Sequence, residues 1–469
     1  MNINRSLIQF NYCITLPMFG TLIMKTLSFI LLIFSGLISA STLKSGPMLG
    51  HTALRGANIW VETHKPAHVK IKYWQKGHKD KTSFLSTNTT DANYNMHTFK
   101  LKGLQPGLSY HYQIWVNKKP IQKKAETFTF KTQKLWMWRT DPPDFTVITG
   151  SCNFENEEAH DRAGTPYGGG YEIFDTIAKQ EADMMLWLGD NWYYRPVDFD
   201  AEQNMIYRAS KDKGRDFLQP IFRKFPNYAI WDDHDFGPDN SGGYFIHKQK
   251  SLDIFKKIWA NPSYGMPETP GIFTKVRFND VDFFLLDDRY HRSNEQFPDG
   301  PDKHMYGAEQ LLWLKNQLIA STQPFKFIVG GSQMLNDYHK WEGWDKYRYE
   351  RDAFIKWLDE AKIEGVVFLS GDKHHTEMLK IPRENAYPLY ELTCSPFTAG
   401  THESFIESER TKPSLIQDTL VGEKNFCKLK FDGPRKDRNL TLESYDVDGK
   451  LLWSKKIKHS ILTYSAHEK

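Results

Sequence analysis

The sequence lacks a strong excess of charge of either sign, and no block of basic residues stands out. Its 469 residues include 61 basic and 57 acidic side chains, for a formal net charge of +4. Binding of nucleic acid through a basic patch is therefore not indicated. The chain also lacks internal repeats and low-complexity tracts. Its length exceeds what one ordinary core needs, so we expect two domains.

No apolar run is long enough to span a bilayer comfortably as a helix. The apolar residues 27–38 follow Met24-Lys25-Thr26 and end in small residues. A basic start, a short apolar run and a small-residue end are typical of a secretory signal peptide, placed here in residues 1–40 with Met24 as an alternative start. An N-terminal membrane anchor is the competing interpretation. We expect a periplasmic or secreted protein with no membrane span once the signal is removed.

Cysteine is scarce, with four residues in the whole chain. If Cys13 leaves with the signal, three cysteines remain, and an odd number leaves at least one free thiol. Cys152 is the one whose context explains a free thiol, because a metal-bound thiolate is protected. Cys394 and Cys427 could form a disulfide or remain two buried thiols.

Residues 41–135 are predicted to form an all-β domain. Period-two alternation runs through residues 57–61, 69–73, 95–101, 110–116 and 127–131. Turn residues separate these runs at the spacing of a β-sandwich, and residues 101–112 resemble the E–F corner of fibronectin type III-like domains. No catalytic constellation lies here, so a packing and positioning module is expected.

Residues 136–469 are predicted to form an α/β catalytic domain. Apolar strand patterns alternate with helical patterns at residues 171–181, 307–320 and 350–363. Hairpins are expected at residues 273–286 and 440–454. The alternation indicates a sheet covered by helices.

Four short polar motifs carry the functional signal of this domain. Each directly follows an apolar run that is typical of a buried strand. The motifs are Gly-Ser-Cys-Asn at 150–153, Gly-Asp-Asn-Trp-Tyr-Tyr at 189–194, Trp-Asp-Asp-His-Asp at 231–235 and Ser-Gly-Asp-Lys-His-His at 370–375. Ligands of open α/β sheets bind outside the carboxyl ends of the strands. Together the motifs predict one polynuclear metal site.

The residue types indicate which metals would bind. Thiolate and phenolate are poor ligands for Mg²⁺ or Ca²⁺, so Cys152 and Tyr193 favour a transition metal, with Fe³⁺ first. His374 suits the same ion. Asp233, Asp372 and Asn240 are oxygen donors for a harder neighbour such as Ca²⁺ or Mg²⁺, and Mn²⁺ or Zn²⁺ are alternatives there. Asp190 can bridge both cations.

Each motif alone has a simpler interpretation. A Gly-Asp pair is usually a turn, an isolated Cys152 is usually a small buried hydrophobe, and residues 232–235 could be a solvated loop. Four strand-end clusters in one domain are hard to explain as four accidents, which favours the metal site.

The four motifs, in this order, resemble the PhoD-like alkaline phosphatases of the metallophosphoesterase superfamily. Residues 285–292 also resemble that family's Leu-Asp-x-Arg-x-x-Arg segment. The resemblance covers residues 136–400 and implies a four-layer αββα sandwich, preceded by a fibronectin III/immunoglobulin-like β domain.

The resemblance also implies roles for individual residues. It places Cys152, Asp190, Tyr193 and His374 on Fe³⁺, and Asp190, Asp233 and Asp372 on Ca²⁺. His234 falls where the superfamily keeps a histidine that assists phosphoryl transfer.

Two arginines and a second histidine complete the predicted site. Arg289, with Arg292 in reserve, is expected to hold a phosphate oxygen, although a salt bridge to a neighbouring Asp is equally compatible with the sequence. His375 is expected to contact substrate. We also consider that Trp192, Tyr193, Tyr194, Trp341 and Trp344 form either an aromatic cleft or a lid.

The expected function is hydrolysis of small-molecule phosphate monoesters by a metal-activated hydroxide, in a monomeric enzyme. A phosphodiesterase or phospholipase C-like enzyme on the same site is the first alternative. A non-catalytic surface binding protein is the second.

Overall fold

The computed structural model describes residues 43–122, 126–337 and 342–467. The predicted signal region and Trp341 lie outside these residues. Residues 42–469 form one compact unit. Among the described residues, no helix combines the length and the apolar character needed to cross a membrane.

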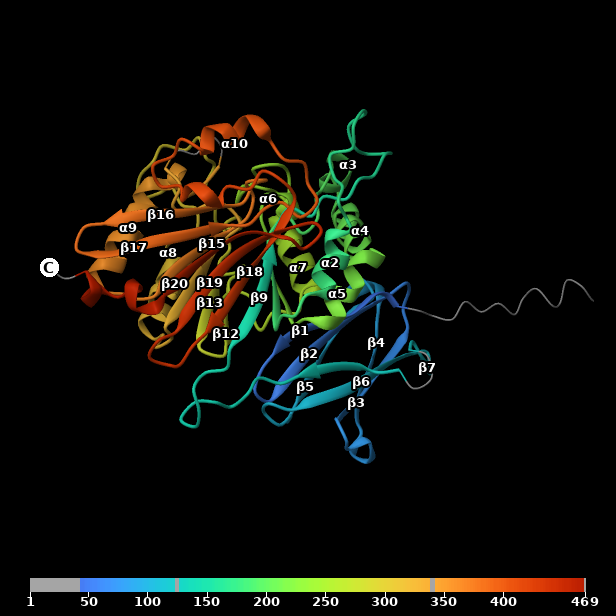
Figure 1. Ribbon diagram of the computed structural model, residues 1–469. Helices are drawn as coiled ribbons and strands as arrows, with labels where there is room; N and C mark the ends of the chain where they lie inside the picture. Colours follow the sequence, from blue (N-terminus) through green and yellow to red (C-terminus); the bar gives the residue numbers. More distant parts are fainter. Residues whose placement is uncertain (1–42, 123–125, 338–341, 468–469) are drawn as a thin grey trace, which may run out of the picture. The chain divides into compact units, whose positions relative to one another are not determined.

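The N-terminal part is all-β, as predicted (Figure 1). One antiparallel sheet contains β1 (Leu43–Thr52), β2 (Gly56–Thr63) and β5 (Met96–Lys102). The other contains β3 (His68–Gln75), β4 (Ser83–Asn88), β6 (Ser109–Val116), β7 (Lys119–Pro120) and β8 (Phe128–Lys131). Alternate residues of the strands, such as Ile59, Val61 and Ile71, are fully buried in a core of their own.

Three strands of this region escaped sequence analysis. β7 has two residues, which are too few to show a pattern. β1 contains a Gly-Pro pair and several register shifts, and all but one residue of β4 are exposed, so neither of these two shows clean alternation. The predicted E–F corner is supported by one hydrogen bond, in which the Gln105 backbone N–H donates to Tyr110 Oη over 2.8 Å. Such a tyrosine bond is a feature of sandwich corners.

The remaining strands form two six-stranded sheets. The first has the order β11 (Asn227–Ile230), β10 (Met184–Leu188), β9 (Phe145–Gly150), β18 (Asn425–Asp432), β19 (Asn439–Asp446) and β20 (Leu451–Lys458). The second has the order β12 (Thr274–Phe278), β13 (Val281–Leu285), β14 (Phe325–Val329), β15 (Val366–Ser370), β17 (Ala386–Thr393) and β16 (Glu377–Arg383). Both predicted hairpins are present, as β12–β13 and β19–β20.

Helices cover the outer faces of the two sheets, giving the four-layer αββα arrangement (Figure 1). α8 (Ala308–Ile319) and α9 (Arg348–Glu360) lie on one side, and α2 (Ile173–Lys179), α5 (Gln219–Lys224) and α7 (Lys248–Ile258) on the other. Shorter or more peripheral helices are α3 (Pro196–Phe199), α4 (Glu202–Lys213), α6 (Asp233–Phe236) and α10 (Glu403–Glu409). The three predicted helices form, each within a few residues of its expected ends.

Parallel pairing brings the motif-bearing strands to a common edge. β9, β10 and β11 are parallel neighbours, and β15 lies among the parallel strands of the second sheet. Every residue of β10, β11 and β15 is buried. Strands buried on both faces need continuous apolar runs, which is why these were recognisable in the sequence.

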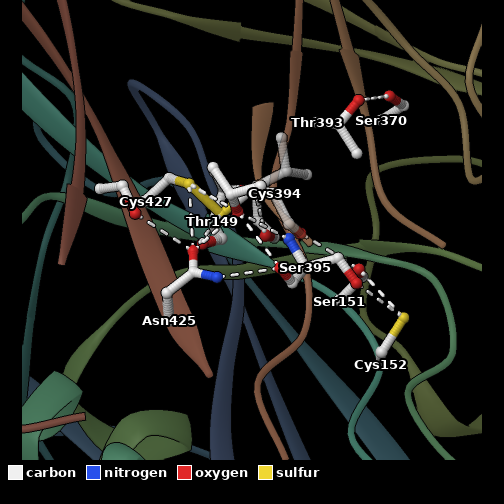
Figure 2. The surroundings of a disulfide bond; sticks show 12 residues. Thr149, Ser151, Cys152, Ser370, Thr393, Cys394, Ser395, Asn425 and Cys427 are labelled. Atoms are coloured by element: carbon white, nitrogen blue, oxygen red, sulfur yellow. Dashed lines mark hydrogen bonds between the residues drawn. A yellow bond between two sulfur atoms is a disulfide. The ribbon is translucent and has the colours of Figure 1, made fainter. Parts of the chain in front are cut away.

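A disulfide joins the two sheets (Figure 2). Cys394, directly after β17, is bonded to Cys427 in β18, which decides between the two alternatives left open by the sequence. The next residue, Ser395, places its Oγ 3.1 Å from Cys152 Sγ. The disulfide of Cys394 is therefore adjacent in sequence to Ser395, which contacts the predicted metal ligand Cys152. Cys152 is the one free cysteine in the described part of the chain, as expected.

We predict that the double substitution Cys394→Ser/Cys427→Ser lowers the free energy of unfolding by about 3–4 kcal/mol, because the bond closes a loop with a sequence separation of 33 residues in the unfolded chain. Urea unfolding of the oxidised wild type, the reduced wild type and the variant measures the effect. The reduced wild type should match the variant. Equal unfolding midpoints for all three samples would contradict the predicted contribution of the bond.

Candidate metal centre

The predicted ligands leave their strands in a conformation that L-amino acids rarely adopt. Positive φ angles occur at Cys152 (60°), Asp190 (51°), Asn240 (57°), Asp372 (67°) and His374 (54°). Backbone strain of this kind costs free energy and concentrates at functional sites. Close packing around the ligands restricts the backbone to this conformation. A Cβ on Gly189, itself at φ 94°, would lie 2.7 Å from Asp232 Cβ.

One group of side chains joins sulfur, oxygen and nitrogen donors. Cys152 Sγ lies 3.5 Å and Tyr193 Oη 3.2 Å from Asp190 Oδ2. Tyr193 Oη is also 3.4 Å from His374 Nε2. Donor atoms of Cys152, Asp190 and His374 all lie within 4.8 Å of one another. The four residues that sequence analysis assigned to the transition metal therefore converge.

The orientation of His374 suits a ligand. Its Nδ1–H donates to the Gly400 carbonyl over 2.7 Å, which leaves Nε2 free to face the other donors. Burial lowers the pKa of His374 to about 4, so the ring is neutral at physiological pH. A neutral imidazole is the form that binds metals.

A second group contains only carboxylates. Donor atoms of Asp190, Asp232, Asp233 and Asp372 lie within 4.8 Å of one another. Asp190 belongs to both groups, as expected for a bridging ligand. Asp232 was not among the predicted ligands. It also pairs with an arginine, as described below.

The electrostatics of the centre are such that a cation would stabilise its buried acidic groups in their ionised forms. Burial, followed by repulsion from Cys152 and from neighbouring aspartates, holds the pKa of Asp190 well above its ordinary value. Burial likewise raises the pKa of Asp372 and of the Cys152 thiol. Within the described residues, Asp232 Oδ2 and Asp233 Oδ1 are buried and accept no hydrogen bond. Asp233 Oδ1 also lies 3.9 Å from Arg289 Nη2. Buried carboxylate oxygens that accept no hydrogen bond fit a site built for metal ions.

Asp233 differs from its neighbours. Burial alone would raise its pKa, but His234, Arg289 and the Asn240 backbone N–H outweigh this effect and lower the pKa to about 2. Asp233 therefore carries its charge without any metal.

His234 lies beside the carboxylate group and is partly open to solvent, with a side-chain exposure of 26%. Its Nε2 is 3.8 Å from Asp233 Oδ2 and 3.6 Å from Asp239 Oδ1. The ring also packs on Tyr193, with centroids 4.2 Å apart. It is thus both near the donors and accessible to a ligand.

Asn240 is exposed, and it contacts the centre through its backbone N–H, which donates to Asp233 Oδ2 over 2.8 Å. The predicted side-chain ligand role of Asn240 stays a prediction.

Arg289 is fully buried and forms the salt bridge that sequence analysis considered as the alternative. Its guanidinium pairs with Asp232 and, over 2.8 Å, with Glu342, and it donates to Ser332 Oγ over 2.9 Å. Arg292 also pairs with Glu342 over 2.8 Å. These contacts occupy the side chain that was expected to hold phosphate. The geometry favours a positioning role for Arg289 behind the aspartates.

His375 points away from the predicted ligands. It belongs to a separate buried group with Glu377 and Glu409, and its Nε2 lies 3.5 Å from Glu377 Oε1. With 2% of its surface exposed, it is not positioned to meet substrate in this conformation.

The expectation of an aromatic cleft is wrong for three of the side chains. Trp192, Tyr194 and Trp344 are buried in the main hydrophobic core, with exposures of 1%, 6% and 0%. Large apolar side chains after a buried strand continue the core, and composition alone cannot separate core from cleft.

Sequence analysis missed residues that support the ligands from loops. Tyr167 Oη lies 2.8 Å from His374 Nδ1 and 3.2 Å from His402 Nε2, and His402 stacks on His374 with ring centroids 5.2 Å apart. Ser395 Oγ contacts Cys152 and accepts a hydrogen bond from the His374 backbone. Tyr167 and His402 are not preceded by a strand pattern, so no local signal marked them. Ser395 follows the end of β17 by two positions, but serine is not a residue type that indicates a metal ligand. Asp232 was recognisable, because it directly precedes Asp233.

Family models match both parts of the chain. A family model described as "PhoD-like phosphatase" matches residues 147–436. A model described as "Domain of unknown function (DUF7800)" matches residues 40–134. Alkaline phosphatase D of Bacillus subtilis (strain 168) is 22% identical over 322 residues, which cover 58% of this chain and 52% of that protein. Tartrate-resistant acid phosphatase type 5 of Sus scrofa is 28% identical over 164 residues, covering 34% and 44%. The chain thus spans about half the length of the curated relatives it matches.

Two solved structures share the fold. The structure described as "Structure of PhoD" matches with a TM-score of 0.72 at 15% identity, covering 90% of this chain and 93% of that one. Purple acid phosphatase PPD1 from yellow lupin (Lupinus luteus) seeds matches with a TM-score of 0.63 at 14% identity, covering 92% and 77%. The predicted four-layer architecture is confirmed.

We predict that Arg289→Met lowers the free energy of unfolding by about 3–5 kcal/mol, because it leaves the buried carboxylate of Asp232 without its partner and removes one of the two arginines that pair with Glu342. Denaturant unfolding measures the effect. Lys356→Met, which breaks an exposed pair with Glu360, is the control and should change stability by less than about 1 kcal/mol. An equal, small effect of both substitutions would show that Arg289 is not a structural partner.

Proposed function

This chain belongs to the PhoD-like phosphatase family, and we propose that it is a metal-dependent phosphatase that hydrolyses phosphate monoesters. The observation that carries the proposal is Asp190. Its carboxylate lies in both donor groups, within 4.8 Å of the donors of Cys152 and His374 and of those of Asp233 and Asp372. A carboxylate shared by two donor sets is what a two-metal hydrolytic centre requires.

We assign Fe³⁺ to the group of Cys152, Asp190, Tyr193 and His374, and Ca²⁺ to the carboxylate group, with Mg²⁺, Mn²⁺ or Zn²⁺ as replacements for Ca²⁺. The donor chemistry supports the assignment, since thiolate and phenolate select a transition metal and carboxylates suit a hard cation. When bound, the two cations would activate a water to hydroxide and neutralise the charge of the phosphoryl group.

The residues of the chain have separate tasks in this proposal. Asp190, Asp233 and Asp372 hold the cations, and Tyr167 and Gly400 orient the ring of His374. Arg289 fixes Asp232 beside the carboxylate group. His234 is the titratable side chain that is both beside Asp233 and open to solvent, so we assign it the proton transfer to the leaving oxygen.

Two other functions remain as alternatives. A phosphodiesterase or phospholipase C-like activity would use the same donors, because the metal ligands do not set how many ester groups the substrate carries. A non-catalytic binding protein would also retain the fold. We favour the enzyme because both donor groups are complete, with every predicted ligand except Asn240 placing its side chain at the centre.

We also propose that the protein is exported and acts in the periplasm or outside the cell as a monomer. Support comes from the basic, apolar and small-residue pattern of residues 1–40. The disulfide between Cys394 and Cys427 agrees with an oxidising compartment.

The first test compares turnover of p-nitrophenyl phosphate and bis-p-nitrophenyl phosphate by the metal-loaded protein, with iron and calcium quantified in the same sample. The proposal predicts a higher kcat/KM for the monoester. A preference for the diester would move the assignment to the phosphodiesterase. A metal-loaded protein that turns over neither ester would establish the binding protein.

The second test is His234→Gln. We expect kcat to fall by about 10²–10⁴-fold while metal content is kept, because His234 transfers a proton and holds no metal in this scheme. The exposed His160 supplies the matched control, and His160→Gln should keep the wild-type kcat. Loss of metal in His234→Gln would make this residue a ligand, and an unchanged kcat would remove it from the reaction.

A further inference from the structure

The near-neutral charge of the whole chain conceals a strongly basic segment. Residues 42–135 contain fifteen lysines and one arginine but only four acidic residues, which gives this segment a net charge of +12. The full chain carries +4, so the remainder is net acidic. The net charge of the whole chain does not reveal this difference, because the basic segment and the acidic remainder largely cancel. A charge difference of this size between two parts of one chain indicates a segment that meets an anionic partner.

Three of the lysines share one face of the β3–β4–β6 sheet with aromatic rings. In β3, Val69 and Ile71 are fully buried, so the alternating Lys70 and Lys72 point to the opposite face. We call this the basic face, and it consists of Lys70, Lys72, Trp74, Lys79, Phe84 and Trp115.

The ammonium groups of the basic face are held above the rings. Lys70 Nζ lies 4.2 Å from the ring centroid of Phe84, and Lys72 Nζ lies 4.2 Å from that of Trp115. Lys79 Nζ lies 5.6 Å from the centroid of Trp74. Cation–π contacts of this kind restrict long side chains that would otherwise move freely. The face therefore presents three positioned charges.

No acidic side chain neutralises these charges within the described part of the chain. In those residues Lys70, Lys72 and Lys79 form no ion pair, in contrast to Lys44, which pairs with the buried Glu62 over 3.2 Å. Glu62 is one of only four acidic residues in the segment. Fixed cations without counter-charges on a flat sheet are suited to a ligand with repeated negative charges.

We propose that the basic face binds an acidic polysaccharide, a chain of sugars that carry carboxylate groups. Single-stranded nucleic acid is favoured less, because it binds by stacking bases on open aromatic faces, and here the ammonium groups cover ring faces. An anionic membrane is also favoured less. Peripheral binding needs several apolar side chains to insert, and Phe84, 61% exposed, is the one strongly exposed large apolar side chain of this face.

This binding does not depend on the proposed phosphatase activity. The basic face lies in β3, β4, β6 and the short 3-10 helix Lys79–Lys81 that connects β3 to β4, and none of its residues belongs to the metal centre. Its effect would be to concentrate the protein on surfaces that carry acidic glycans.

The test measures binding of the full-length protein to immobilised polygalacturonate at low and high salt. We expect binding at low salt that weakens as salt screens the charges. The variant Lys70→Gln/Lys72→Gln/Lys79→Gln should bind at least about tenfold more weakly, because it removes the three positioned charges. Its hydrolysis of p-nitrophenyl phosphate should equal that of the wild type.

The matched control removes the same charge from another surface of the segment. Lys65→Gln/Lys100→Gln/Lys102→Gln changes three exposed lysines, two of them on β5 in the other sheet. This variant should retain binding to within about twofold, since only total charge changes. An equal loss of binding in both variants would overturn the proposal that the basic face is the specific binding surface.

Two further ligands test which class of anionic partner the basic face binds. A single-stranded oligonucleotide and vesicles of anionic phosphatidylglycerol are tested under the same conditions. Tighter binding of either than of polygalacturonate would overturn the proposal in favour of that ligand. Weaker binding of both, together with loss in the basic-face variant, supports the acidic polysaccharide.

Discussion

The concentration of buried negative charge at one edge of the sheets is the constraint on which the rest of this structure depends. Donor atoms of four aspartates, Asp190, Asp232, Asp233 and Asp372, lie within 4.8 Å of one another. Such charges repel strongly where water is excluded. Arg289 compensates for part of this charge by pairing with Asp232. Burial, followed by repulsion from neighbouring acidic groups, keeps the pKa of Asp190 and Asp372 high, and bound cations would stabilise their ionised forms.

The fold brings the acidic side chains together at the ends of neighbouring strands. Parallel β9, β10 and β11 bring three motifs to one edge, and β15 of the second sheet supplies the fourth. The backbone N–H of Gly371 donates to the Gly331 carbonyl over 2.7 Å, so the loops after β15 and β14 are joined directly. The disulfide of Cys394 then connects the two sheets next to Ser395, the hydrogen-bond partner of Cys152 and His374 (Figure 2). Scaffold and ligands are thus stabilised by the same contacts.

Sequence analysis predicted what is encoded locally. A few residues are enough to predict a buried strand followed by Cys152, Asp190 or Asp233. The alternation of such strands with helices predicted the α/β architecture. Contacts between segments that are far apart in the sequence could not be predicted. Arg289 meets Asp232 across 57 positions and Tyr167 reaches His374 across 207. The sequence named Cys394 and Cys427 as a possible pair but left open whether they form a disulfide. The basic segment was missed for a different reason, because a sum over the whole chain cancels opposite charges.

The most direct measurement is a crystal structure of the metal-loaded protein with anomalous scattering recorded at the iron edge and away from it. The account predicts an iron peak within bonding distance of Cys152, Tyr193 and His374. It predicts a second cation beside Asp233 and Asp372, with Asp190 bonded to both. A single metal, or metals bound away from Asp190, would contradict the central claim that these strand ends form one two-metal centre.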